Sequence, residues 1–263
     1  MSVMRQCEDL FANRLRTSFL NYLQPRWNLL PHACLLLLLA LPAGASEEQA
    51  LTPYWAEYKV SISVLGGRLT TELRATDEGY EANHVIKPTG LARMFKNGVI
   101  SETSHFDATE KGIQASWYRS EDSLSKKKTR AEVTFDWPGN EISGTINDEE
   151  VQFLLEGLVH DRVAIQYQLM HDLLNGDPDE RYILYDIDEF KTLVVSTIGE
   201  REVKTRAGTY NAVGIQHQAE NSSRVTTLWC VPELGFTPAV IEQHRDGKLR
   251  LRATLRSYSP LTE

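Results

Sequence analysis

Apolar and polar residues alternate along most of this chain. Between Tyr54 and Val64 every second residue is apolar or aromatic, while Glu57, Lys59 and Ser61 occupy positions between them. Side chains of a β-strand point alternately to the two faces of a sheet, so a period of two is typical of a strand with one buried face. The segment therefore predicts a half-buried β-strand.

The same alternation returns at a spacing of roughly 8 to 12 residues, which is typical of all-β domains. Turn residues such as Gly66-Gly67 and Asp77-Glu78-Gly79 separate the repeats. We expect a mainly β protein, either a curved antiparallel meander sheet or an open barrel-like roll of about 11–14 strands, wrapped around one central amphipathic helix. The further predicted strands cover residues 69–75, 80–87, 100–106, 113–119, 130–137, 142–146, 151–155, 181–187, 192–198, 201–205, 209–217, 224–231, 239–244 and 248–258.

One segment, residues 161–174, breaks the alternation. Val163 and Tyr167 recur there at helical spacing, and a second apolar row runs beside them. Asp161 can cap the start of a helix and Asn175-Gly176 can end it. Such a broad apolar face predicts a helix buried against the concave side of the sheet.

An apolar run at residues 33–41 is followed by the small residues Ala43 and Ala45. This pattern is typical of a cleaved signal peptide, and its core of about 9 residues is far shorter than the roughly 20 needed for a stable membrane span. We predict a signal peptide at residues 1–45, a single β-rich exported domain at 46–263, and a periplasmic location. The true translation start stays open.

The charge balance and the cysteines narrow the classes of function. The predicted leader takes four of the 28 basic and two of the 36 acidic residues, which leaves a formal net charge of −10. This acidic balance argues against a nucleic-acid partner, which needs a basic face. Of three cysteines, only Cys230 follows the leader, so no internal disulfide is expected and buried packing is the favoured role of its thiol.

No catalytic motif stands out, and the catalytic residues stay unknown. The chain has no nucleophile elbow, no calcium-loop spacing and no paired histidines on one helical turn. Glu242 and His244 share a strand face, which fits a polar cross-strand pair better than a metal site. The acidic cluster of Asp186, Asp188 and Glu189 is interpreted as a solvated turn. We predict no cofactor and no metal.

Large apolar side chains beside single polar groups give the candidate ligand-binding residues. If the curved sheet leaves space inside, such residues could line a pocket for an acyl chain or a glycan, although packing in the core is the simpler interpretation. Two of them fall in residues 89–96, a second helical candidate that could equally be a loop. The candidate residues are Arg93, Phe95, Glu102, Trp117 and Arg119.

Several segments match a known family in order and spacing over nearly all of the chain after the leader. They are Tyr58-Lys59-Val60, Thr89-Gly90-Leu91-Ala92, Ser101-Glu102, Tyr118-Arg119, Asp161-Arg162 with Gln166 and Gln168, Ala207-Gly208-Thr209-Tyr210-Asn211-Ala212, and Thr226 to Pro238. In these segments the chain resembles the exported bacterial proteins grouped as domain-of-unknown-function 3108. Cys230 departs from the aromatic residue expected after Trp229. The resemblance implies a mostly β periplasmic domain and brings no catalytic residues.

These observations favour a non-enzymatic ligand-binding or envelope-assembly module that resembles a lipid or glycan carrier. The alternative is an envelope hydrolase acting on polysaccharide or peptidoglycan. Two carboxylates roughly 5 to 10 Å apart across an open groove would favour the hydrolase, and a closed apolar interior would oppose it. A third interpretation is a structural protein that docks on a partner through a sheet edge. Ligand identity and oligomeric state stay open.

Overall fold

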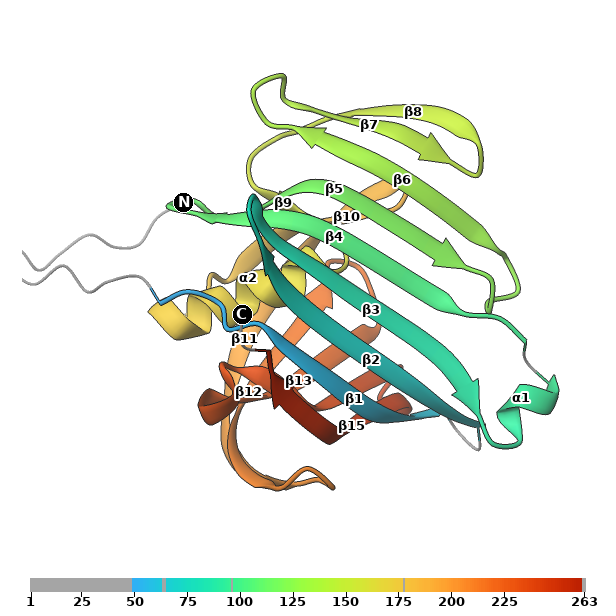
Figure 1. Cartoon of the computed structure of the whole chain (residues 1–263), viewed down its shortest axis with the longest axis vertical. Helices are drawn as coiled ribbons and strands as arrows, with labels where there is room; N and C mark the ends of the chain where they lie inside the picture. Colours follow the sequence, from blue (N-terminus) through green and yellow to red (C-terminus); the bar gives the residue numbers. More distant parts are fainter. Residues whose placement is uncertain (1–48, 63–64, 96, 177, 262–263) are drawn as a thin grey trace, which may run out of the picture. The chain divides into compact units, whose positions relative to one another are not determined.

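A computed structural model describes residues 49–62, 65–95, 97–176 and 178–261 of the chain (Figure 1). The described residues belong to one compact unit, Ser46–Glu263. They form a mainly β structure with a single large sheet. The predicted signal peptide at residues 1–45 lies outside the described residues.

Fifteen strands make up the sheet in the described residues, in the order β8-β7-β6-β5-β4-β3-β2-β1-β15-β14-β13-β12-β11-β10-β9. Every neighbouring pair is antiparallel except β9 and β10, which are parallel. The strands are β1 (Tyr54–Ile62), β2 (Leu65–Thr76), β3 (Gly79–Thr89), β4 (Ile100–Thr109), β5 (Gly112–Asp122), β6 (Thr129–Asp136), β7 (Glu141–Ile146), β8 (Glu149–Leu154), β9 (Val159–His160), β10 (Arg181–Asp186), β11 (Glu189–Lys204), β12 (Thr209–Ala219), β13 (Arg224–Val231), β14 (Thr237–Arg245) and β15 (Lys248–Pro260).

The meander has two arms that meet at the chain's first and last strands. β1 pairs with β2 on one side and with β15 on the other, so the strands before and after the helical segment form one continuous sheet. The described strands leave β8 and β9 at its two edges.

The number of strands exceeds the predicted 11 to 14. Residues 192–198 and 201–205, predicted as two strands, form the single strand β11, whose pairing shifts register between Thr197 and Glu200. Gly199, with a φ of 96°, lies at this irregularity. It breaks the alternation of apolar and polar residues, so the sequence predicted two strands where there is one. The short strand β9 was not predicted, because two residues carry no readable alternation.

Within the described ranges, three short helical segments accompany the sheet. They are α1 (Ala92–Phe95), α2 (Ala164–Asn175) and the 3₁₀ turn η1 (Pro232–Leu234). None of the helices in the described residues has the length and apolar character needed to cross a bilayer.

The helix α2 follows the predicted segment closely. Asp161 precedes it, and the Oδ1 atom of Asp161 accepts hydrogen bonds from the backbone N–H groups of Val163 at 2.8 Å and Ala164 at 2.9 Å. These bonds satisfy donors that a helix start leaves free, as the capping prediction requires. Gly176 is the C-cap residue.

Two apolar clusters contact α2. In the larger, the ring of Tyr167 stacks on Phe106 of β4 with centroids 5.2 Å apart, and Val163 and Met170 lie in the same cluster. In the smaller, Ile165 and Leu169 pack with residues of β10 to β13. Both the predicted apolar rows of the segment are therefore buried, which explains why so short a helix is stable.

Candidate functional site

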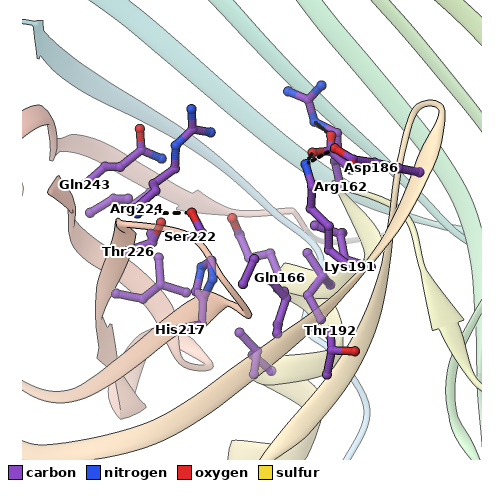
Figure 2. A pocket seen from close by; sticks show the side chains of 18 of the residues that line it. Arg162, Gln166, Asp186, Lys191, Thr192, His217, Ser222, Arg224, Thr226 and Gln243 are labelled. Carbon is purple, nitrogen blue, oxygen red and sulfur yellow. Dashed lines mark hydrogen bonds and ion pairs between the residues drawn. The ribbon is translucent and has the colours of Figure 1, made fainter. Parts of the chain in front are cut away.

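A cavity of about 1160 Å³ lies between the inner face of β2 to β4 and the residues of α2 and β10 to β14. Figure 2 shows that its labelled polar side chains come from separate elements, with Arg162, Asp186 and Lys191 in one group and His217, Arg224 and Gln243 in another. A pocket of this size has room for a small amphiphile or oligosaccharide.

One wall of the cavity is an aliphatic row that crosses three strands. Leu69 of β2 is directly opposite Ile86 of β3, and Ile86 is directly opposite Ile100 of β4. All three side chains are only half-buried, although they face the interior. The row therefore offers apolar surface that the protein itself does not cover.

The facing wall is aliphatic too. It belongs to the smaller apolar cluster, so its side chains are held in place by packing behind them. The cavity residues contributed by this cluster are Ile165, Leu169, Leu184, Leu193, Ala219, Leu228 and Ile241.

A polar row runs beside the aliphatic row, one step along the strands. Thr71 of β2 is opposite His84, His84 is opposite Glu102, and Glu102 is opposite Ser120 of β5. Since the inner face repeats every second residue, this row separates the cavity from the packed core around Phe106.

Glu102 is the centre of a charged network at the cavity wall. Its Oε1 atom accepts a hydrogen bond from the Tyr118 hydroxyl at 2.7 Å and lies 3.1 Å from Nε of Arg162. The same Nε lies 3.7 Å from Oδ1 of Asp186, which is also paired with Lys191. The guanidinium therefore lies between two carboxylates and links the segment just before α2 to β4 and β10.

Asp161, the neighbour of Arg162 in the chain, holds the network in position. It is fully buried, and its Oδ2 atom accepts a hydrogen bond from the Ser104 hydroxyl at 2.6 Å while Oδ1 caps α2. Burial raises the pKa of its carboxyl to about 6, although these hydrogen bonds act in the opposite direction. Asp161 therefore fixes the start of α2, and with it the position of Arg162.

Two histidines face the cavity in neutral form. Desolvation lowers the pKa of His84 to about 4, partly offset by the charge of Glu102, and desolvation also lowers the pKa of His217 to about 4. Nε2 of His84 lies 3.3 Å from the Tyr167 hydroxyl on α2. At pH 7 both imidazoles are uncharged and can accept or donate hydrogen bonds.

The structure does not bring the predicted ligand-binding residues together. Glu102 lines the cavity. Trp117 and Arg119 alternate with the buried Tyr118, so they face the other side of β5, where the Trp117 ring packs on His105 with centroids 4.9 Å apart. Arg93 on α1 is exposed and donates through Nε to the Pro88 carbonyl at 3.2 Å.

The side chain of Phe95 lies outside the described residues, so its predicted role stays a prediction. Thr89–Lys96 was left open between helix and loop, and a single helical turn forms there, α1.

Sequence reasoning missed His84, Arg162 and Asp186. The interpretation of Asp186 as part of a solvated turn was wrong, since its side chain is only 27% exposed and pairs with Arg162; Asp188 and Glu189 are exposed as predicted. A signal for His84 was available, because the turn after Thr76 fixes which residues of β2 and β3 are opposite each other.

Other predictions concern residues away from the cavity centre. Cys230 is buried, and desolvation raises the pKa of its thiol to about 12, as its packing role requires. Glu242 pairs with Arg252, 3.5 Å away, on the neighbouring strand. Over the described ranges, no group of three or more His, Cys, Asp or Glu side chains is placed to hold a metal ion.

Comparison with known families decides the classification. The model of the family described as protein of unknown function (DUF3108) matches residues 54–254, which include every strand but part of β15. The chain belongs to the DUF3108 family. The resemblance inferred from the sequence segments is thereby confirmed. No curated protein gives a significant match to this DUF3108 chain.

A solved structure is similar to this DUF3108 protein in fold. It is the crystal structure of a beta-barrel-like protein of domain of unknown function DUF1849 from Brucella abortus, with a TM-score of 0.59 and 13% sequence identity. The match covers 82% of this chain and 100% of that one. At this identity the likeness concerns the fold alone.

Proposed function

We propose that this protein is exported to the periplasm and there binds a lipid-like amphiphile, as a carrier or as a module of envelope assembly. The observation that carries the proposal is the pair of aliphatic walls, with Leu69, Ile86 and Ile100 facing Ile165 and Leu169 across an open cavity of about 1160 Å³. Uncovered apolar surface inside a cavity favours an apolar ligand group, because burying it stabilises the complex by roughly 25 cal/mol per Å².

The polar groups of the cavity complete the match to an amphiphile rather than to a plain hydrocarbon. Glu102, Arg162 and Asp186 form a charged wall beside the aliphatic row. A ligand with both an apolar chain and a polar head can contact both walls at once. A glycan would use the polar wall but leave the aliphatic row exposed, so we favour the lipid-like ligand.

The proposal includes a sheet that wraps around α2 as its central support. The supporting facts are the buried residues on both apolar rows of α2 and its packing against β4 and β10 to β13. A helix fixed in this way keeps the facing wall of the cavity rigid, so that little ordering of the protein is needed when a ligand binds.

A displacement assay tests ligand binding. The protein, freed of bound lipid by extraction, is titrated with a dansyl-labelled fatty acid, and the bound probe is then displaced by unlabelled amphiphiles. We expect saturable binding that Ile86→Trp weakens, because the larger ring takes up part of the cavity beside the aliphatic row. The control Val85→Trp adds the same ring on the other face of β3, where it leaves binding unchanged. Equal loss in both variants, or no saturable binding, contradicts the proposal.

Export is tested separately. Leu37→Arg, in the apolar run, should block cleavage of the signal peptide, because a charge there disrupts the apolar core that a signal peptide needs. The unsubstituted protein should be recovered from the periplasmic fraction with a chain beginning at Ser46. Recovery of full-length chain in the cytoplasm would contradict a periplasmic location.

One observation favours a second candidate, an envelope glycoside or peptidoglycan hydrolase. Oxygens of Glu102 and Asp186 lie 3.1 Å and 3.7 Å from Nε of Arg162, so two carboxylates lie close together at the cavity wall, as a glycoside hydrolase requires. The guanidinium itself occupies the space between them, which leaves no place there for a glycosidic bond. Release of soluble fragments from purified peptidoglycan, lost in Asp186→Asn, would favour the hydrolase.

A further inference from the structure

Three arginines line a smaller hollow that continues from the cavity. This hollow has a volume of about 450 Å³ and is lined by Arg224, Arg245 and Arg250, together with Gln243 and Asp246. Arg224, Gln243 and Arg245 also line the large cavity, so the two spaces share a wall.

The strand register brings two of these positive charges face to face. Arg224 of β13 is directly opposite Arg245 of β14, an arrangement that like charges disfavour. Arg250 lies on β15 next to the point where the β14–β15 pairing shifts register after Gln243. The sheet therefore gathers three cations at one end of the cavity in a chain whose formal net charge is −8.

These cations are not neutralised within the described part of the chain. Other arginines of the same strands have partners: Arg252 lies 3.5 Å from Glu242. For Arg224, Arg245 and Arg250, the described residues contain no carboxylate within ion-pair distance, although Asp246 borders the hollow. An anion placed among them would relieve their mutual repulsion.

The cavity face of β13 and β14 changes from apolar to cationic in regular steps. Successive directly opposed pairs on this face are Leu228 with Ile241, Thr226 with Gln243, and Arg224 with Arg245. Four residues of a strand span about 13 Å, so Leu228 on the facing aliphatic wall and Arg224 lie about that far apart along β13. This order fits an amphiphile whose acyl chain lies against the facing aliphatic wall and whose headgroup lies at the arginines.

We infer that Arg224, Arg245 and Arg250 bind the phosphate of an amphiphile whose acyl chain occupies the large cavity. Guanidinium groups match the geometry of phosphate oxygens and can bind them with two parallel hydrogen bonds. The inference rests on the proposed function and adds the chemical class of the headgroup.

The test compares two ligands that differ in the phosphate alone. Titration calorimetry measures the affinity of the full exported protein for a single-chain lysophosphatidic acid and for the monoacylglycerol with the same chain. We expect the phosphate to raise affinity about 10-fold or more, as hydrogen bonds to charged groups do. Glycerol 3-phosphate, the headgroup alone, is the third probe and should bind far more weakly than the lipid.

Matched double variants locate the effect. Arg224→Gln with Arg245→Gln should remove the preference for the phosphate, so that the two lipids then bind with similar affinity. The control, Arg93→Gln with Arg119→Gln, removes the same charge from exposed positions that do not line either space, and it should keep the preference.

The outcomes separate this inference from the proposed function. Equal affinity for both lipids, or a preference that survives the Arg224 and Arg245 substitutions, overturns the phosphate site and leaves amphiphile binding standing. Binding of glycerol 3-phosphate as tight as that of the lipid would assign the arginines to free phosphate esters and also overturn the inference. If neither lipid binds, the proposed function itself fails.

Discussion

Nε of Arg162, just before α2, lies 3.1 Å from Oε1 of Glu102 on β4. The contact joins the helix to the sheet at the boundary between the packed core and the cavity, and the Tyr118 hydroxyl donates to the same oxygen. The Glu102 side chain is only 11% exposed, so these partners replace most of the water around its carboxylate.

Removing the guanidinium should destabilise the fold. Arg162→Gln leaves the buried carboxylate without its cation, and we expect the free energy of unfolding to fall by about 2 kcal/mol, less than for fully buried pairs because Arg162 is itself partly exposed. Urea denaturation measures the change. In a double-mutant cycle with Glu102→Gln, the double variant should cost clearly less than the two single changes together. Additive costs would show that the two groups do not interact.

Asp161 should matter more as an acceptor than as a charge. Asp161→Ala removes the acceptor of the Ser104 hydroxyl and of two backbone N–H groups, at an expected cost of about 2–3 kcal/mol. Asp161→Asn keeps a carbonyl oxygen for the helix N–H groups and should cost about 1 kcal/mol or less. Thermal unfolding of both variants gives the comparison. An Asn variant as unstable as the Ala variant would count against the capping role.

Gly112 should tolerate no side chain, because it lies against α2. Its φ is 105°, and a Cβ there would lie 2.5 Å from Oε1 of Gln168, the atom that accepts the Ile113 N–H at 2.7 Å. Gly112→Ala should therefore cost about 2 kcal/mol or more, from backbone strain and the lost hydrogen bond. Gly157→Ala is the matched control, since its φ of 79° brings similar strain while its Cβ would meet open space. Equal costs would place α2 further from β5.

Stability should fall as the solution is acidified from pH 6.5 to pH 4. His84, His160 and His217 each have a pKa lowered to about 4 by desolvation, so between these pH values the unfolded chain binds up to three more protons than the folded one. Asp161, with its pKa raised to about 6 by burial, acts in the opposite direction because there the folded chain holds the extra proton.

The net difference of about two protons predicts a loss of roughly 3 kcal/mol per pH unit near pH 5. Denaturant unfolding across this range measures how the free energy of unfolding depends on pH. His217→Gln should remove about one of the two protons and therefore about half of this slope. A slope that His217→Gln leaves unchanged, or stability that rises on acidification, would mean that these imidazoles are not desolvated.

The alternation of residue types was enough to predict most of the strands, because most strands bury one face. Tyr54 to Val60 shows this well, with every second side chain buried as the pattern requires, whereas Ile62 at the end of β1 is exposed. The helix before Gly176 was predictable for a similar reason, since its two apolar rows stand out against the surrounding period of two. The parallel contact of β9 with β10 depends on a connection through α2 and left no local pattern.

The cavity could be predicted only in part, because it depends on register between distant strands. His84, Glu102 and Arg162 are far apart in sequence and meet through one strand pairing and the capped start of a helix. The prediction that Trp117 and Arg119 line one pocket with Glu102 could have been refined from the alternation of side chains along β5. Because the buried Tyr118 points to the inner face, its two neighbours point to the outer face.

The central claim is that the cavity between α2 and the sheet holds the chain of an amphiphile. The most direct measurement is a crystal structure with a single-chain amphiphile brominated at its terminal carbon, located by the anomalous signal of bromine. The account predicts a bromine peak between Ile86 and Leu228, within the cavity lining. Peaks confined to the outer faces of the sheet, or an unchanged cavity at saturating amphiphile, would contradict it.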